Sequence, residues 1–208
     1  MILVTGFDYQ NATNASGILV KSLKNDLADV LVPFKDELAF EVITCDETSR
    51  ETEHRTLESQ LDELLVQYAP TICIHTGQAP PYNKITIEKI ALNSFRQEII
   101  DPERPVAYWS DLPGTDDMRE VLENNGIPAC YSYYCGQHTC NHILYSSLFF
   151  STQNVSGHKA GFIHIPLLPE QVTGGFRESP YMPLEMTREA LSIIIAHVAG
   201  EAGIKIQQ

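Results

Sequence analysis

Short runs of β-branched and aromatic residues alternate along the chain with longer stretches in which apolar residues recur at helical spacing. Several of the short runs end at Gly or Pro, which commonly flank strands. These runs predict strands at residues 1–5, 39–44, 71–76, 105–109, 129–133 and 160–165. The longer stretches lie between them, so strands and helices are expected to follow one another through the whole sequence.

The helical signal is clearest where apolar residues at i, i+4, i+7, i+8 and i+11 form one stripe of a 3.6-residue period, at Leu57, Leu61, Leu64, Leu65 and Tyr68. A second stripe begins after Pro183 and ends before Gly200, and these are typical start and stop residues of a helix. Helices are therefore expected at residues 15–29, 50–68, 116–125, 140–152 and 184–199.

This alternation predicts an α/β fold, a single-domain three-layer α/β/α sandwich over residues 1–208 with a largely parallel central sheet. Ligands of such sheets bind outside the carboxyl ends of the strands, so catalytic residues are sought in the loops that follow strands. Residues 77–84 and 167–182 are rich in Pro, Gly and Tyr and are expected to be loops. Gly174-Gly175 predicts a turn and not a nucleotide-binding loop.

The charge of the chain excludes several classes of partner. Lys and Arg number 14 against 27 Asp and Glu, a net charge of −13. Such a surface repels phosphate backbones and anionic lipids, so neither nucleic acid nor a membrane is expected as a partner. No apolar run approaches the ~20 residues of a membrane span, and the N-terminus starts as a strand without a basic leader. We expect a cytoplasmic protein.

The five cysteines are the most informative residues of the composition, because a cytoplasmic chain keeps its thiols free. Cys140 follows the strand at 129–133 after a short Gly-containing connection and opens the helix expected at 140–152. The positive end of a helix dipole favours the thiolate, which is the nucleophilic form. A small buried hydrophobe would also suit this position. The most economical interpretation of three other cysteines is structural: Cys45, Cys73 and Cys130.

Two further titratable residues are candidates to act with Cys140. His164 ends an apolar strand ahead of a Pro-rich loop, where a base facing a cleft would lie. Glu88 lies in the apolar segment 85–93, where a carboxylate is either solvated in a turn or buried to orient a partner. In a triad, the imidazole would take the thiol proton while the carboxylate fixes the imidazole. The spacing leaves this arrangement open, because triads assemble in space.

Motifs spread over nearly the whole chain match those of one known family, and the stretch around His164 is the most specific of them. They are Leu3-Val-Thr-Gly-Phe7, His75-Thr-Gly77, the segment 85–93, Ala107-Tyr-Trp-Ser110, Gly126-Ile-Pro-Ala129, Cys140-Asn141, Gly161-Phe-Ile-His-Ile-Pro166 and Met182-Pro-Leu-Glu185. On these residues the sequence resembles pyroglutamyl peptidase I, or pyrrolidone-carboxylate peptidase, a family of cytoplasmic cysteine peptidases that remove N-terminal pyroglutamate.

The resemblance implies a function, a substrate and a set of residues. The family's acid, nucleophile and base fall on Glu88, Cys140 and His164. The substrate would be an N-terminally blocked peptide, the fold an α/β/α sandwich, and the assembly a homo-oligomer without cofactor or metal. The oxyanion would be stabilised by backbone N–H groups near Cys140 and in the loop 77–82.

The chain departs from the family pattern around the expected substrate pocket. Gln10 stands where the family has a second aromatic residue, and Tyr82 follows Pro81 in place of Gly-Arg. His138 and Thr139 replace an aromatic and an aliphatic residue before the nucleophile. Phe7 and Ile99 are the remaining apolar candidates to contact the ring of the substrate. We therefore hypothesise a divergent member whose substrate is pyroglutamyl or a related, more polar N-terminal group.

Three alternatives stay open at this point. The cysteines and histidines at 130–142 (Cys130, Cys135, His138, Cys140 and His142) would bind zinc, although their spacing matches no common zinc module. The chain would instead be a non-catalytic binding protein that retains the fold. Separately, Cys135 would form a disulfide with Cys140 under oxidation and switch the enzyme off.

Overall fold

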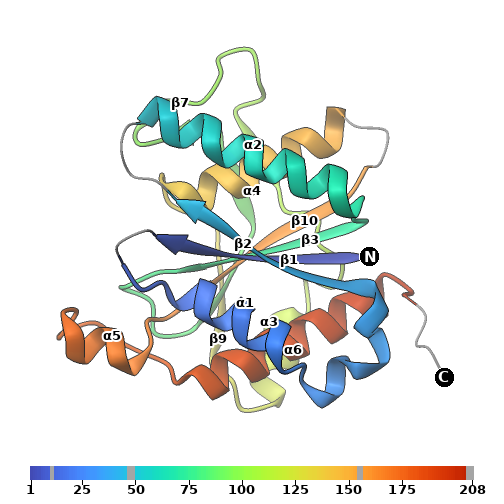
Figure 1. Cartoon of the computed structure of the whole chain (residues 1–208), viewed down its shortest axis with the longest axis vertical. Coiled ribbons are helices and arrows are strands. Elements are labelled where there is room, and N and C mark those ends of the chain that lie inside the picture. Colours follow the sequence, from blue (N-terminus) through green and yellow to red (C-terminus); the bar gives the residue numbers. More distant parts are fainter. Residues whose placement is uncertain (10–11, 46–49, 154–156, 205–208) are drawn as a thin grey trace.

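The computed structural model describes residues 1–9, 12–45, 50–153 and 157–204, with the side chains of residues 50 and 51 left out. A six-stranded sheet crosses its middle in the order β2-β1-β3-β10-β4-β9 (Figure 1). The strands are β1 (Ile2–Tyr9), β2 (Leu38–Cys45), β3 (Ile72–Gln78), β4 (Ile85–Glu88), β9 (Ala129–Ser132) and β10 (Lys159–Ile165). The first four in that order are parallel, β4 is antiparallel to β10, and β9 is parallel to β4. The prediction of a largely parallel sheet is confirmed.

Helices cover both faces of this sheet, as the sequence predicts for a three-layer sandwich. Figure 1 shows α2 (Arg50–Tyr68) and α4 (Thr139–Gln153) on one face. On the other face lie α1 (Ala15–Asn25), α3 (Met118–Asn124) and α6 (Leu184–Glu201). A short helix, α5 (Pro169–Gly174), follows β10 and leads to α6.

One expected helix is shorter than predicted. Asn14 caps α1 by accepting a hydrogen bond from the backbone N–H of Ser16, but the helix ends at Asn25 and not at residue 29. Asp26 already has extended dihedral angles, and the chain continues as a 3₁₀ helix, η1 (Asp29–Glu37), that contains Pro33. Apolar residues continue at helical spacing past Asp26, so the sequence pattern does not indicate that the helix ends at Asn25.

The strand expected at 105–109 is also wrong in its position. Only residues 107–109 form a strand, β8 (Ala107–Trp109), and it pairs with β5 (Ile90–Leu92) outside the central sheet. Val106 and Trp109 are 83% and 63% exposed, so this β-type run is not a core strand. The sheet position it was expected to fill belongs to β4, which the sequence pattern did not reveal. A third small pairing joins β6 (Ser94–Phe95) to β7 (Glu98–Ile99).

Alternation along the strands divides the buried apolar residues into two cores, one on each face. Ile163 and Ile165 of β10 join the core under α1, α3 and α6, which we call the α6-side core. Phe162 of the same strand joins the core under α2 and α4, the α4-side core. His164 shares the face of Phe162, because it lies two residues further along the strand. Among the described residues, no helix combines the length and the apolar character needed to cross a membrane.

Candidate active site

Glu88 and His164 are brought together by the antiparallel pairing of β4 with β10. In this register Phe162 pairs with Glu88 and His164 pairs with Thr86. Residues two apart on a strand share a face, so Glu88 and His164 are diagonal neighbours on the α4 side. The Nδ1 atom of His164 lies 2.7 Å from Oε1 of Glu88, and both side chains are buried. The geometry is that of an imidazole N–H donating to a carboxylate.

Cys140 approaches the same histidine from the first turn of α4. The Sγ atom and the imidazole are hydrogen-bonded, and Cys140 is half-buried. Because the first N–H groups of a helix have no acceptor within the helix, this turn adds positive electrostatic potential around the sulfur. His164 therefore bridges Cys140 on one side and Glu88 on the other.

Gly77 provides the space that this contact needs. It lies at the end of β3 beside His164, its register partner on β10. A β-carbon at this position would lie 2.7 Å from Sγ of Cys140 and 2.7 Å from Cζ of Phe162, closer than real contacts allow. In the sequence Gly77 is visible only as part of a motif, since a close approach across strands leaves no local pattern that would reveal its role.

The charge state of His164 follows from these neighbours. Burial lowers the pKa of the imidazole, but the negative charge and hydrogen bond of Cys140, with those of Glu88, outweigh this and raise it to about 9. At neutral pH the histidine is therefore an imidazolium, hydrogen-bonded to Cys140 and to Glu88. Such a pair has a sulfur ready for nucleophilic attack and a proton ready for a leaving group.

Cys135 is the second sulfur of this site. It is buried, and its thiol lies within 4.8 Å of ligand atoms of Glu88 and His164. Burial, Glu88 and Cys140 all raise the pKa of its thiol, so it stays protonated beside the reactive pair. All five cysteines are free thiols in the structure. The disulfide between Cys135 and Cys140 stays a prediction.

Aromatic rings surround the histidine. The ring of Tyr82 meets His164 edge-on with 5.5 Å between centroids, and Phe162 lies 4.8 Å from the imidazole. Phe7, at the end of β1, stacks on Phe162 at 6.2 Å. Burial and the charge of Glu88 raise the pKa of Tyr82, whose side chain also bonds to Ser132. Tyr82 therefore covers the His164–Glu88 pair.

Thr139 lies next to Cys140 in sequence, and its side chain is buried. Its hydroxyl donates to Oε1 of buried Glu53 on α2, at 3.0 Å, and Arg96 forms an ion pair with the other oxygen of Glu53. The backbone N–H of Arg96 in turn donates to the carbonyl of Gln137, at 2.6 Å. This network holds the start of α4 against α2 and the β6–β7 turn.

Two of the remaining predicted contact residues are exposed, and the third lies outside the described residues. Ile99, on β7, is 62% exposed, and His138 is exposed at the residue before α4. Gln10 lies outside the described residues. The amide groups of the 77–82 loop are partly occupied, since those of Ala79 and Tyr82 donate to backbone carbonyls. The first turn of α4 is thus the better source of oxyanion donors.

The cysteines and histidines between 130 and 142, all within the described ranges, separate in the fold. Cys130 contacts Thr86, 3.4 Å from its hydroxyl, and Cys135 joins the catalytic group. His142 points to α2, where it lies near His54. Cys45 and Cys73 are buried in the α4-side core, and burial raises the pKa of Cys73 to about 12. The geometry does not support a shared zinc cluster of residues 130–142.

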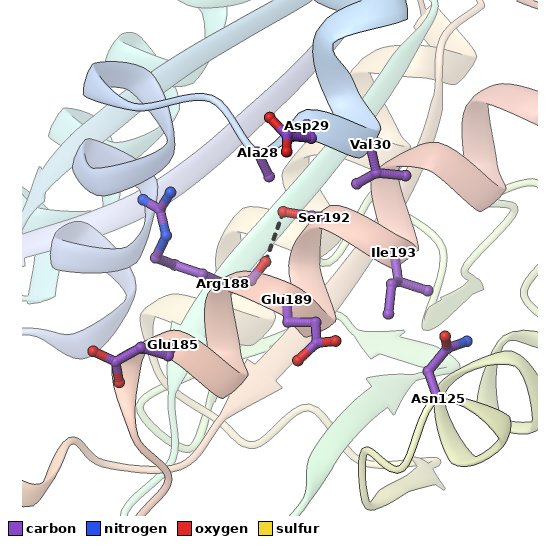
Figure 2. Close-up of a pocket in the computed structure, with 9 residues that line it drawn as sticks. All are labelled: Ala28, Asp29, Val30, Asn125, Glu185, Arg188, Glu189, Ser192 and Ile193. Carbon is purple, nitrogen blue, oxygen red and sulfur yellow. Dashed lines mark hydrogen bonds between the residues drawn. The ribbon is translucent and has the colours of Figure 1, made fainter.

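A surface hollow of about 470 Å³ lies on the far side of the sheet. Figure 2 shows its walls, which come from α6, the start of η1 and Asn125. Its cation, Arg188, donates to the backbone carbonyl and carboxylate of Asp26. The hollow shares no residue with the group around His164.

Comparison with known proteins agrees with this geometry. A family model described as pyroglutamyl peptidase matches residues 1–201. The chain belongs to the pyroglutamyl peptidase family. Pyrrolidone-carboxylate peptidase from Thermococcus litoralis is 34% identical over 152 residues, 65% of this chain and 69% of that protein. The enzyme of the same name from Pyrococcus furiosus is 36% identical over 150 residues, 65% and 72% of the two chains.

Solved structures of the family superpose on the whole chain. A mutant pyrrolidone carboxyl peptidase from Pyrococcus furiosus has a TM-score of 0.82 at 28% identity, covering 97% of this chain and 99% of that one. Pyroglutamyl peptidase I from Bacillus amyloliquefaciens has a TM-score of 0.79 at 28% identity, with 96% of each chain covered. The recognition made from the motifs, the fold class and the assignment as a cysteine exopeptidase are confirmed.

Proposed function

We propose that this protein is a cysteine peptidase that removes a pyroglutamyl residue, or a related and more polar cyclic group, from the N-terminus of peptides. The observation that carries the proposal is the position of His164, hydrogen-bonded to Cys140 and 2.7 Å from Glu88 in a member of the pyroglutamyl peptidase family. Acid, base and nucleophile come from three separate elements, β4, β10 and α4.

Acylation begins when the Cys140 thiolate attacks the carbonyl carbon of the substrate's first residue. A carbon–sulfur bond forms, and the carbonyl oxygen becomes an oxyanion that the free N–H groups of the first turn of α4 stabilise. The imidazolium of His164 then gives its proton to the leaving amine as the carbon–nitrogen bond breaks. The products of this step are a free peptide amine and a thioester on Cys140.

In deacylation the same histidine acts as a base instead of an acid. Neutral His164 takes a proton from water, whose oxygen attacks the thioester, and the carbon–sulfur bond breaks to restore the thiolate and imidazolium. Glu88 keeps Nδ1 protonated and stabilises the positive charge, so that Nε2 faces the sulfur. No cofactor takes part in these steps.

The substrate-contacting residues follow from their positions. Tyr82 is half-buried with its ring against His164, whereas the stacked rings of Phe7 and Phe162 are buried, so Tyr82 is the aromatic residue best placed to meet a substrate and Phe7 remains a predicted contact residue. We propose Thr139 as a positioning residue, because its hydroxyl is committed to Glu53. Gln10, His138 and Ile99 remain predicted contact residues. A cytoplasmic location and a homo-oligomeric assembly are proposals that rest on the sequence and the family.

A panel of N-terminally blocked aminoacyl-coumarins tests this function. Wild-type protein should release coumarin from the pyroglutamyl compound or from a more polar cyclic relative, and Cys140→Ala should release none. The matched control is Cys130→Ala, which removes a half-buried thiol of β9 outside the catalytic group and should keep the activity. Activity in Cys140→Ala would refute the proposed nucleophile.

Alkylation separates the enzyme from a binding protein that keeps the fold. Iodoacetamide should modify Cys140 well below pH 8, because a hydrogen bond to an imidazolium and a position at a helix N-terminus both make a cysteine more reactive. The buried thiol of Cys73, whose pKa is raised to about 12, is the internal reference and should react far more slowly. Equal rates at the two positions would favour the non-catalytic alternative.

A further inference from the structure

A second group of metal-binding side chains lies where α2 packs on α4. His54 and Glu58 are four residues apart on α2, so they share one face of that helix. His142 comes from α4, and one ligand atom from each of the three residues lies within 4.8 Å of the others. Two imidazoles and one carboxylate form the donor set of many zinc sites.

The distances within this group suit a single small cation. Nδ1 of His54 lies 2.7 Å from Nε2 of His142, and Oε1 of Glu58 lies 3.8 Å from the same Nε2. The other carboxylate oxygen, Oε2, lies 3.7 Å from Nε2 of His54, and one ligand atom of each residue lies within 4.8 Å of the others. Zinc at roughly 2.0–2.1 Å from tetrahedral ligands would set them about 3.3 Å apart. To bind zinc, the two imidazole rings need to separate by roughly half an ångström. The imidazole that carries the proton of their hydrogen bond must also shift that proton to its other ring nitrogen.

Neighbouring residues already hold two of the three ligands. The ring of His142 stacks on Phe95, with 4.7 Å between centroids. Oε1 of Glu58 accepts hydrogen bonds from Arg104 at 2.8 Å and Ser146 at 2.9 Å, which orient the carboxylate so that Oε2, on the side of His54, would bind the cation. Such outer contacts orient ligands in metal sites.

The group is accessible and separate from the catalytic site. The side chains of His54 and Glu58 are 26% and 17% exposed, whereas His142 is fully buried. An ion can therefore reach the ligands from solvent. Cys140 and His142 are two residues apart on α4, which turns their side chains about 200° from one another. The sulfur faces β10 while the imidazole faces α2.

We propose that His54, Glu58 and His142 form a zinc-binding site that links α2 to the start of α4, with water as the fourth ligand. The positive charge of Arg104 partly neutralises the negative charge of the Glu58 carboxylate. The site therefore binds zinc more weakly than a structural zinc site with several thiolates. Zinc bound here stabilises the native state, because the unfolded chain does not hold the three ligands together.

Zinc titration calorimetry on the Cys135→Ala/Cys140→Ala protein tests this site without interference from the sulfurs of the catalytic group. One zinc per chain is expected, together with a rise in the thermal unfolding midpoint. His54→Gln should weaken binding at least tenfold and abolish that rise. The matched control is His138→Gln, an exposed histidine on the loop before α4, which should bind zinc like the parent.

Spectroscopy keeps the proposal testable even if a variant unfolds. Zinc added to the same parent protein should shift the imidazole nitrogen resonances of His54 and His142 and leave those of His197 in place. Cobalt should give visible d–d absorption without sulfur charge-transfer bands. The proposal is overturned if the parent binds no zinc at millimolar concentration, if His54→Gln binds it as tightly, or if only His164 shifts.

Discussion

The two faces of the central sheet carry different kinds of core. The α6-side core contains aliphatic and aromatic side chains packed under α1, α3 and α6. The α4-side core includes many buried polar groups beside its apolar residues. They are Thr5, Glu53, His75, Glu88, Thr139, Asn141, His142, Ser146, Ser147, His158 and His164.

Several buried polar side chains of the α4 side are held in specific pairs. Thr5 bonds to His75 at 2.7 Å, and Ser147 bonds to His158 at 3.1 Å. The Asn141 side chain accepts from the backbone N–H of Leu92 and donates to its carbonyl. Unpaired, such groups would cost several kcal/mol each, so every one of these contacts constrains the fold. Both faces bury apolar residues, but all the buried acids and histidines of the described residues lie on the α4 side, whereas buried polar residues of α1 and α6, such as Ser16, Thr187 and Ser192, are uncharged.

The largest expected effect on activity comes from a substitution on the α4 side of the sheet. Glu88→Gln removes the charge that stabilises the imidazolium, so kcat should fall about 10³–10⁴-fold. The substitution also removes a cause of the raised pKa of His164, so the alkaline limb near pH 9 should move to lower pH. The pH profile of kcat/KM measures both changes. Glu185→Gln, an exposed carboxylate on the far side, is the control, and an equal shift there would contradict the assignment.

A core substitution on the opposite face should affect stability alone. Leu191 of α6 is buried in the α6-side core, and Leu191→Ala should lower the free energy of unfolding by about 2–5 kcal/mol. Turnover per folded molecule should stay at the wild-type value. Urea unfolding and active-site titration measure the two quantities. A fall in turnover beyond the loss of folded protein would show that the two faces are coupled.

Gly77→Ala should affect chemistry more than stability. The added β-carbon would meet Sγ of Cys140 and the ring of Phe162 at 2.7 Å, so the thiol must move. A displacement of this kind costs about 10²-fold in kcat. The control is Gly174→Ala, where a β-carbon would have no neighbour within 4 Å. Single-turnover kinetics would contradict the steric argument if both variants acylate at the wild-type rate.

The smallest expected effect is a pH dependence of stability from His75. Burial, with a smaller contribution from His158, lowers the pKa of its imidazole to about 3. Between pH 6.5 and 3 the unfolded chain binds a proton that the folded protein does not, so stability falls as pH falls. The slope from this residue is about 1.4 kcal/mol per pH unit well below pH 6.5.

His164 contributes in a different pH range, so the two effects can be separated. Its pKa is raised to about 9, so its stabilisation is complete below pH 6.5 and is lost as pH rises towards 9. Urea unfolding at pH 5.5 and 6.5 should show a weaker pH dependence in His75→Gln than in wild type. An unchanged slope would mean that His75 is not the group that titrates.

The sequence predicted α2 and α6 closely, because their apolar stripes are long and periodic. It missed β4, because the alternation of Ile85 and Ile87 with Thr86 and Glu88 spans only four residues, too few to separate a strand from a loop. It predicted Thr139 as a substrate contact and gave no sign of the hydrogen bond that its hydroxyl makes, because position next to Cys140 in sequence does not fix the direction of a side chain. Glu53, the actual partner of that hydroxyl, lies 86 residues away.

The sequence by itself determined the alternation of strands and helices, the cysteine at the start of α4, and the family, because each depends on local patterns of residues. Only the tertiary structure decided how these residues meet. Glu88 and His164 are 76 residues apart, and their contact depends on an antiparallel pairing that no local periodicity encodes. The space left by Gly77 and the turn of His142 towards α2 depend in the same way on packing between distant segments.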